Sequence, residues 1–373
     1  MNNGHPIRVL HCVAGNLYGG IETLLATLAR ARALAPGMGP EFALCFEGRL
    51  SEELRGAGVP VHMTGPARFS RPWTVWGSRR SLGRVLATRS LDVVVTHGCW
   101  PHLLFGPVAR RSGKPLVYWM HDRINGDQWV ERVAARTLPD LTLVNSRGTA
   151  ETLPKLFPNG PSDVLYYPVS PPRPSGNRAK TRNALGASDE TTVILQTSRM
   201  EPWKGHALLI AALGRLRAKA GWSAWIAGGA QRPHERAYLA SLQAAVGTAG
   251  IGDRVRFLGD RADVPDLLAA ADVHCQPNTG PEPFGIAFVE ALYARLPLVS
   301  TRMGGAAEIV DESCGLLVPP ADPTALAEAL ARLIDEPETR DRLGAAGPER
   351  ARLLCDPAAA LGRLEGLLRR VCS

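Results

Sequence analysis

The chain has 373 residues, of which 45% are hydrophobic and 21% charged, a balance typical of a globular protein long enough for two domains with separate cores. Its formal net charge is +8, and the excess is uneven: residues 1–175 hold 20 basic and 12 acidic side chains, whereas the remainder holds 23 of each. The apolar runs are too short to cross a membrane. The seven cysteines lie far apart without a C-x-x-C pair, which argues against a disulfide framework or a cysteine zinc site.

The N-terminus has no long apolar segment of the kind found in a secretory signal, so we expect a first strand there. Several cysteines fall inside strand-like runs, where the thiol acts as a small hydrophobic group, and this favours a reducing compartment. We therefore expect a cytoplasmic protein. The basic first half could also hold it at an anionic inner membrane face, although a solvated basic surface is the plain alternative.

In the first half, short apolar runs alternate with segments of helical periodicity. A strand at 7–14 is followed by a glycine-containing turn and an amphipathic helix at 21–34. The strands are nearly continuous apolar runs, as expected when both faces of a sheet are covered, and the alternation indicates a parallel α/β sheet. Further strands are predicted at 41–47, 59–65, 91–98, 115–122, 141–146 and 163–169.

A proline-rich segment at 169–177, "VSPPRPSGN", has the composition of a linker. After it the alternation restarts, so the sequence predicts a domain at 1–172, a second at 173–355 and a last helix at 356–373. That helix begins at Asp356, an N-cap residue followed by proline. The strands predicted for the second domain lie at 191–198, 222–229, 255–260, 272–278, 296–301 and 314–320.

Two doubly wound sheets in series suggest where ligands bind. In such sheets the ligand lies outside the carboxyl ends of the strands. We therefore predict that the two domains face each other across a cleft that holds the chemistry, and that the proline-rich segment acts as the hinge.

Two cations follow the first strand of the second half, in the segment "SRMEPWKGH" at 198–206. Lys204 is one of only five lysines among 43 basic residues. A lysine is a compact charge suited to phosphate, and an arginine such as Arg199 can bind phosphate as a fork. The loop therefore predicts an anion site, with two exposed loop cations as the alternative.

A pair of glutamates frames a predicted helix start in "PNTGPEPFGIAFVEALYA". Pro283 and Gly285 suit the first turn of a helix, whose free N–H groups favour an anion. Glu282 would stand at the mouth of that site and Glu290 inside the helix, where a carboxylate can accept hydrogen bonds from sugar or ribose hydroxyls. Alternatively, Glu282 complements the helix dipole and Glu290 is a surface residue.

Two features of the first half also point to the carboxyl edge of its sheet. Gly19 and Gly20 end a glycine-rich loop that could approach a phosphate or form a tight turn; the G-x-G-x-x-G dinucleotide motif is absent. His97 and His121 end two strands, where each could face a ligand or fill a structural role.

Taken in chain order, these motifs resemble the family-four retaining glycosyltransferases of GT-B fold, also called glycosyl transferases group 1. The resemblance covers nearly the whole chain and is most specific over 195–320. It is carried by GG-x-E, R-x4-KG, E-P-F-G-x4-E, "GGAAEIV" and "GLLVPP".

The resemblance implies a GT-B fold with an acceptor-side first domain, a nucleotide-sugar-binding second domain and a last helix that crosses back onto the first domain. It implies that the catalytic residues are His121, near the reacting carbon, and Glu282, on donor-sugar hydroxyls. The implied donor-binding residues are Arg199 and Lys204 on the diphosphate, the backbone near Phe284, Gly285 and Ile286 on sugar and phosphate, Glu290 on the ribose, and Gly19 and Gly20 over the diphosphate.

The implied reaction is transfer of a sugar, with retained anomeric configuration, from a nucleotide donor to a glycan or lipid-linked acceptor in polysaccharide or glycolipid synthesis. UDP is slightly favoured over GDP. We expect no cofactor and no metal, because a cation pair and a helix N-terminus can stabilise the leaving diphosphate and no D-x-D motif occurs.

The segment 68–89 mixes tryptophans with six arginines and an apolar stripe. A basic amphipathic helix of this kind can lie on a membrane or bind a lipid-diphosphate acceptor; a helix packed on the sheet with a solvated basic face is the alternative. No nucleic-acid-binding signature occurs, so we expect no nucleic-acid partner.

Three other functions stay open from the sequence. A UDP-sugar 2-epimerase would use a related two-domain scaffold and would need no acceptor. A sugar phosphorylase would use inorganic phosphate as its acceptor. A nucleotide-sugar sensor would bind the donor and turn nothing over.

Overall fold

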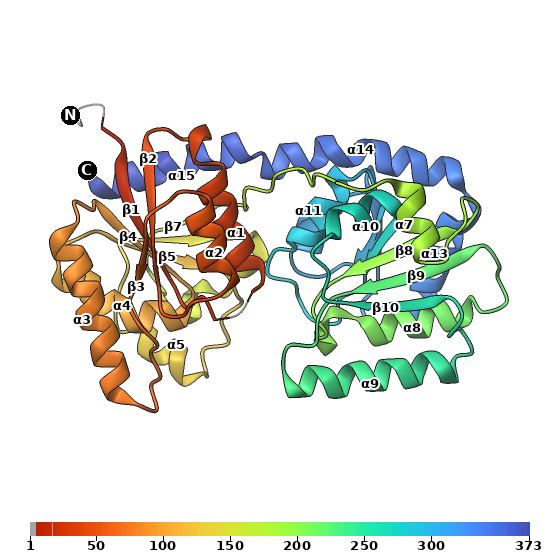
Figure 1. Cartoon of the computed structure of the whole chain (residues 1–373), viewed down its shortest axis with the longest axis horizontal. Coiled ribbons are helices and arrows are strands. Elements are labelled where there is room, and N and C mark those ends of the chain that lie inside the picture. The colour runs from red at the N-terminus through yellow and green to blue at the C-terminus, as the bar shows by residue number, and fades with distance from the viewer. Residues whose placement is uncertain (1–4, 17) are drawn as a thin grey trace. The chain divides into compact units, whose positions relative to one another are not determined.

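The computed structural model describes residues 5–16 and 18–373 (Figure 1). Residues 1–4 of the predicted first domain and Leu17 of the glycine-rich turn lie outside the described residues. The chain divides into two compact units, one formed by residues 1–169 with 355–373 and the other by 170–354. That the two units face each other stays a prediction.

A seven-stranded parallel sheet forms the centre of the first unit, in the order β3-β2-β1-β4-β5-β6-β7. The core strands are aliphatic runs such as Val93–Val95, which are fully buried because helices cover both faces. The strands are β1 (Ile7–Val13), β2 (Met38–Leu44), β3 (Val61–Met63), β4 (Val93–His97), β5 (Leu116–Met120), β6 (Leu141–Val144) and β7 (Ser162–Val164).

Helices connect most of these strands, and the strand order runs outward from β1 in both directions, as in a doubly wound fold. α3 packs on α4 and α4 on α5. The helices are α1 (Gly20–Arg30), α2 (Arg49–Gly56), α3 (Pro72–Thr88), α4 (Cys99–Arg111), α5 (Trp129–Ala134) and α6 (Arg147–Ala150), with 3-10 turns η1 (Arg32–Leu34) and η2 (Leu153–Lys155).

The last helix, α15 (Pro357–Cys372), also belongs to the first unit. The Asp356 carboxylate caps its start by accepting from the Ala359 N–H at 2.9 Å, as the sequence predicts. Arg369 donates to the carbonyl of Gly37 at 2.9 Å, and α15 contacts β4 and η1. The leucines that α15 buries are Leu361, Leu364, Leu367 and Leu368.

A six-stranded parallel sheet forms the second unit, in the order β10-β9-β8-β11-β12-β13. Its strands are β8 (Thr192–Thr197), β9 (Trp222–Ala227), β10 (Val255–Gly259), β11 (Val273–Gln276), β12 (Leu298–Thr301) and β13 (Gly315–Val318). Its helices are α7 (Arg178–Ala184), α8 (His206–Arg215), α9 (Pro233–Thr248), α10 (Val264–Ala270), α11 (Ile286–Tyr293), α12 (Ala306–Ile309), α13 (Pro323–Asp335) and α14 (Pro337–Cys355), with the 3-10 turn η3 (Pro202–Lys204).

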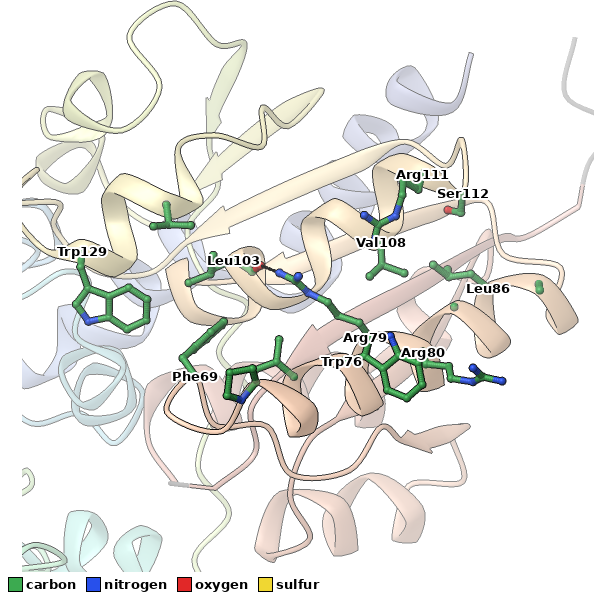
Figure 2. Close-up of a pocket in the computed structure, with 15 residues that line it drawn as sticks. Phe69, Trp76, Arg79, Arg80, Leu86, Leu103, Val108, Arg111, Ser112 and Trp129 are labelled. Atoms are coloured by element: carbon green, nitrogen blue, oxygen red, sulfur yellow. Dashed lines mark hydrogen bonds between the residues drawn. The ribbon is translucent and has the colours of Figure 1, made fainter.

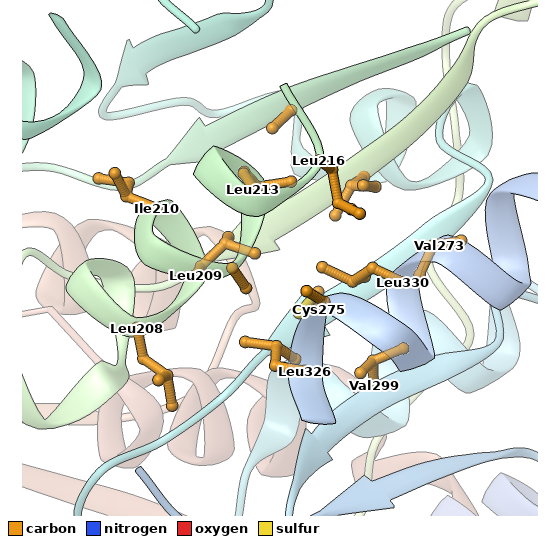
Figure 3. Packing of buried hydrophobic residues seen from close by; sticks show 14 of the residues in the cluster. Leu208, Leu209, Ile210, Leu213, Leu216, Val273, Cys275, Val299, Leu326 and Leu330 are labelled. Atoms are coloured by element: carbon orange, nitrogen blue, oxygen red, sulfur yellow. The ribbon is translucent and has the colours of Figure 1, made fainter. Parts of the chain in front are cut away.

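The core of the second unit lies where α8 and α13 pack together over the sheet (Figure 3). Leu209 and Leu213 of α8 meet Leu326 and Leu330 of α13, and all four are fully buried. These positions recur three or four residues apart, which places each pair on one helix face. The packing fixes the start of α8, directly after the loop that carries the two predicted cations.

Two strand predictions needed correction. β2 spans Met38–Leu44 rather than 41–47, because the backbone from Met38 pairs with β1 although it includes a glycine and a proline. β7 stops at Val164 instead of running to 169. Beyond it Tyr167 is buried and its hydroxyl is hydrogen-bonded to His121, which draws the chain away from the strand pairing.

Candidate active site

Most of the predicted donor-binding residues lie at the point where strand order reverses in the second unit. β8 and β11 are neighbours there, although two strands separate them in the chain. Connections from their carboxyl ends leave in opposite directions, which opens the usual ligand site of a doubly wound sheet. Arg199 and Lys204 follow β8, and Glu282 follows β11. The topology thus brings together groups about 80 residues apart.

Glycines allow the loops of this site to touch backbone to backbone. A Cβ on Gly205 would lie 1.8 Å from the carbonyl oxygen of Pro277, and one on Gly305 would lie 2.1 Å from that of Phe284. No side chain fits at either distance. The Gly305 N–H also donates to the Glu282 carbonyl at 2.7 Å. The loops after β8, β11 and β12 are therefore packed as one unit around Glu282.

Lys204 and Glu282 form an ion pair at the centre of the site. Lys204 Nζ lies 2.6 Å from Glu282 Oε2, and the same oxygen accepts from Gln276 Nε2 and Asn278 Nδ2 at 3.1 Å each. Glu282 is only 7% exposed. Within the described part of the chain its other oxygen, Oε1, accepts no hydrogen bond. The carboxylate is thus held rigidly through Oε2, and Oε1 is available to a ligand hydroxyl.

Arg199 is also paired, which its position in a loop did not predict. One guanidinium nitrogen lies 2.9 Å from Glu201 Oε1, and the other lies 4.0 Å from Glu235 Oε1. Glu235 is fully buried and caps α9 through the N–H groups of Gln231 and Arg232. The two carboxylates orient Arg199, and the guanidinium stays about one third exposed.

The N-terminus of α11 lies beside this cluster in the sequence and begins as predicted after Gly285. Gly285 adopts a left-handed φ of 104°, and a Cβ there would lie 2.4 Å from the Phe288 ring. Among the described residues, the backbone N–H groups of Gly285 and Ile286 donate to no partner. The helix dipole and these free donors make the loop a place for an anion.

Glu290 lies one turn further along α11 and is partly buried. Burial raises the pKa of its carboxyl from 4.5 to about 7, because the charged form loses hydration. Across residues 5–16 and 18–373 the carboxylate has neither an ion pair nor a hydrogen bond. An unpaired, desolvated acid in a helix beside an anion site is a candidate for ligand contact.

The first unit holds a row of three buried histidines, contributed by β1, β4 and the end of β5. His11 Nδ1 lies 3.0 Å from His97 Nε2, and His97 Nδ1 lies 2.9 Å from His121 Nε2. His121 Nδ1 is bonded to the Tyr167 hydroxyl, which also accepts from Asn145 Nδ2 at 3.1 Å. The sequence singled out His97 and His121, and the structure adds His11.

Burial keeps this row neutral. It lowers the pKa of His11 and of His121 to about 3, and that of His97 well below 6.5. Each neutral imidazole has one N–H, so the bonds along the row all point the same way. Among the residues that the structure describes, His11 Nε2 has no hydrogen-bond partner. The tautomers of the three rings set the direction of the row: a row that donates toward Tyr167 has the proton of His121 on Nδ1, and the reverse direction has it on Nε2.

This arrangement bears on the role predicted for His121. The residue is 3% exposed, and both ring nitrogens are engaged inside the first unit. A place near the reacting carbon stays a prediction. Gly19 and Gly20 lie at the start of α1, where the Gly19 N–H donates to Glu22 at 3.0 Å; their contact with a diphosphate also stays a prediction.

Comparison with known proteins identifies the family. Residues 177–350 match the family described as glycosyl transferases group 1, and residues 18–173 match glycosyltransferase family 4. The chain is 30% identical over 282 residues to the lipopolysaccharide core biosynthesis mannosyltransferase LpsB of Rhizobium meliloti, which covers 74% of this chain and 72% of LpsB. The chain belongs to the glycosyl transferases group 1 family.

Two further relatives of this group 1 chain come from Nocardioides and Mycolicibacterium smegmatis. A D-inositol 3-phosphate glycosyltransferase of Nocardioides is 31% identical over 294 residues, covering 70% of this chain and 64% of the relative, just under two thirds of its length. A GDP-mannose-dependent α-(1-6)-phosphatidylinositol monomannoside mannosyltransferase of Mycolicibacterium smegmatis is 30% identical over 290 residues, covering 71% and 72%.

Solved structures confirm the predicted fold of this group 1 chain. The Anabaena protein HepE, crystallised with UDP and glucose, superposes with a TM-score of 0.83 at 23% identity, over 97% of this chain and 99% of HepE. A glycosyltransferase of Rickettsia africae superposes with a TM-score of 0.84 at 16% identity, over 98% of each chain. At these identities the likeness concerns the fold alone.

Sequence reasoning missed the side chains that hold the predicted residues in place. Gln276 and Asn278 lie at the carboxyl end of β11. Polar residues at such a strand end, beside the switch point, could have indicated that they belong to the site. Glu201 and Glu235 carry no such signal, because their link to Arg199 depends on how two loops fold. His11 stands inside a buried strand, which is unusual for a polar residue.

Proposed function

We propose that this chain transfers a sugar, with retained anomeric configuration and without a metal ion, from a nucleoside diphosphate donor to a glycan or lipid-linked acceptor. The observation that carries the proposal is the cluster at the β8–β11 switch point. There Lys204, Arg199 and the free N–H groups of α11 offer positive charge, and Glu282 offers an oriented carboxylate oxygen.

In this proposal each group has one task. Arg199 and Lys204 hold the donor diphosphate, and the backbone of Phe284, Gly285 and Ile286 contacts sugar and phosphate. Glu282 accepts hydroxyl groups of the donor sugar through Oε1, while Glu290 accepts those of the ribose. The tasks of His121 in catalysis, and of Gly19 and Gly20 over the diphosphate, are carried forward from the family resemblance.

Charge development explains why such a cluster suits the reaction. Breaking the bond between the sugar and the diphosphate builds negative charge on the leaving oxygen. Fixed cations and backbone N–H groups stabilise that charge without reorganising, and loss of one such donor typically lowers the rate about 10²–10³-fold. Glu282 binds Lys204 at 2.6 Å, so a neighbouring carboxylate orients the ammonium.

The donor base can be found by a thermal-shift screen of UDP-, GDP- and ADP-sugars, since a ligand that binds the folded chain raises Tm by mass action. A UDP-sugar stays our first candidate. GDP-mannose is the second, because the name of the Mycolicibacterium relative includes it. A shift with one base alone would assign the donor class.

For the acceptor, we propose a substrate at or near a membrane. The Mycolicibacterium relative is named for a phosphatidylinositol mannoside. In the part of the chain described, no helix is long and apolar enough to span a bilayer. The basic first unit exposes Trp73 and Trp76 on α3, at 69% and 64%, which supports contact of that unit with an anionic surface.

Lys204→Ala tests the proposal directly. We expect kcat/KM for sugar transfer to fall at least about 10²-fold, with a circular dichroism spectrum like that of the parent. Lys219→Ala is the matched control, because Lys219 forms an exposed ion pair with Asp335 at 2.7 Å. Unchanged turnover in Lys204→Ala would refute the role of Lys204. Conversion of the donor without any acceptor, followed by NMR, would instead indicate an isomerase.

A further inference from the structure

A long groove runs between α3, α4 and α5 of the first unit and has a volume of about 1150 Å³ (Figure 2). Its walls are mainly apolar. Phe69 and Trp129 lie at one end, and Leu86 and Val108 lie toward the other, near Arg111 and Ser112. The groove is large enough for a hydrocarbon chain. Binding of such a chain would remove the apolar surface of the walls from water, which is favourable.

The charged side chains that line the groove are all arginines: Arg79, Arg80 and Arg111. None of the three forms an ion pair with a carboxylate among the residues that the structure describes. The pKa of Arg79 is lowered, first by burial and second by the charge of Arg111. Two guanidinium groups thus repel each other beside an apolar wall, a cost that a bound anion would remove.

The position of Arg79 is fixed by a proline in the neighbouring helix. Pro107 interrupts α4 and has no N–H, so the carbonyl of Leu103, four residues earlier, lacks its usual helical donor. Arg79 Nη2 donates to that carbonyl and Nε to the carbonyl of Leu104, both at 2.9 Å. Within residues 5–16 and 18–373, Nη1 has no partner. The guanidinium is therefore held at the groove wall with one nitrogen available.

We propose that this groove binds a single anionic membrane lipid, with its phosphate between Arg79 and Arg111 and one hydrocarbon chain along the apolar wall toward Phe69 and Trp129. Trp76 and Trp129 are 64% and 51% exposed at the groove, and tryptophan favours the bilayer interface, with its ring in the apolar layer and its N–H in water. Such a site goes beyond adsorption of a basic surface, because it recognises one lipid molecule. It is also independent of sugar transfer.

The first experiment measures binding of decyl phosphate below its critical micelle concentration to the full chain by isothermal titration calorimetry. We expect saturable binding of one molecule. Decyl maltoside lacks the charge and inorganic phosphate lacks the chain, so each should bind at least about tenfold more weakly. Equal binding of inorganic phosphate, or equal binding of decyl maltoside, would overturn the proposal.

Two pairs of variants locate the site. Gly83 lines the groove on α3, and a Cβ there meets no atom within 4 Å. Gly83→Phe should therefore fill the groove without strain and should favour the helix. Gly77→Phe is the control, because Gly77 is equally open on the same helix but does not line the groove. Arg111→Gln removes a groove cation, and Arg84→Gln removes an exposed α3 cation outside it.

We expect Gly83→Phe and Arg111→Gln to weaken the binding of decyl phosphate at least about tenfold and to reduce flotation with phosphatidylglycerol vesicles. The controls Gly77→Phe and Arg84→Gln should leave decyl phosphate binding unchanged. Undiminished decyl phosphate binding in Gly83→Phe would overturn the proposal, as would displacement of the probe by an acidic peptide that binds more tightly. The Tm shift with nucleotide sugars, measured in parallel, should be the same in all four variants. If the parent chain showed no Tm shift with any nucleotide sugar, that result would count against the proposed sugar transfer and not against the lipid site.

Discussion

At the scale of single residues, the site contains two carboxylates in opposite situations. Glu282 accepts three donors through one oxygen, one of them the ammonium of Lys204. Glu290 is partly buried on α11 and has a pKa raised to about 7 by desolvation alone. Glu282 is thus prepared as a fixed acceptor, whereas Glu290 lacks the partner that would stabilise its charge. A ribose hydroxyl pair would supply that partner.

The raised pKa of Glu290 predicts a pH dependence of stability. Between pH 4.5 and 7 the folded chain keeps a proton on Glu290 that the unfolded chain releases, so the contribution of Glu290 to the free energy of unfolding falls as pH rises through this window and is level above it. The full shift corresponds to about 3 kcal/mol as an upper bound. Glu290→Gln should remove this slope and should be more stable than the parent at pH 8, with little difference at pH 4.5. Urea unfolding at both pH values measures it.

Nucleotide binding gives an independent readout of the same carboxyl. An ionised Glu290 accepts two hydroxyl groups better than a protonated one. Affinity for a nucleotide sugar, whose doubly esterified diphosphate does not titrate in this range, should therefore increase from pH 6 to pH 8 in the parent and stay flat in Glu290→Gln. If the variant kept the slope of the parent, another group would be responsible and the ribose role would be withdrawn.

At the scale of secondary-structure elements, the site depends on loops that approach each other more closely than side chains permit. Gly205, Gly228 and Gly304 each lie where a Cβ would be within 2.5 Å of a backbone carbonyl oxygen of another loop. These contacts join the ends of β8, β9, β11 and β12. Their rigidity sets the distance between Lys204 and Glu282, which come from different loops.

Gly205→Ala and Gly221→Ala separate this close approach from ordinary backbone strain. Both glycines have φ near +78°, at 77° and 79°, but only Gly205 faces a backbone oxygen at 1.8 Å, whereas Gly221 has nothing within 4 Å. Gly221→Ala should cost about 1 kcal/mol, the usual penalty of a left-handed residue. Gly205→Ala should cost at least about 2 kcal/mol more and should weaken nucleotide binding. Equal losses in urea unfolding would show that the loops can separate freely.

The sequence predicted the elements better than the contacts between them. Periodicity and turn signals placed both sheets and the helix start at Asp356, whose carboxylate caps α15. These are local features of the chain. The Lys204–Glu282 pair joins residues 78 positions apart and required the strand order β8–β11, which composition does not specify. His11 was not predicted for the same reason, because its hydrogen-bond partner His97 lies on β4.

At the scale of the whole molecule, the buried histidines are divided unequally between the two units. His11, His97, His102 and His121 lie in the first unit and His206 and His274 in the second. Desolvation lowers the pKa of every one of the six. The unfolded chain binds protons at these positions below about pH 6.5, whereas the folded chain does not. Falling pH therefore favours unfolding, and favours it more in the first unit.

This imbalance predicts which unit unfolds first in mild acid. As pH falls from 6.5 to 5, each such histidine lowers the free energy of unfolding by an amount approaching about 1.4 kcal/mol per pH unit. The first unit, with four of these histidines, therefore loses more stability than the second unit, with two. Glu290 acts in the opposite direction in the second unit, because its carboxyl takes up a proton on folding in this window. Hydrogen exchange followed by mass spectrometry, corrected for the intrinsic rate at each pH, should show peptides of β1, β4 and β5 losing protection before those of β8 and β11. His102→Gln should reduce the acid-dependent loss of stability of the first unit by the contribution of one histidine. If protection were lost in both units together, or first around β8, the neutral histidine row would not be what limits stability in acid.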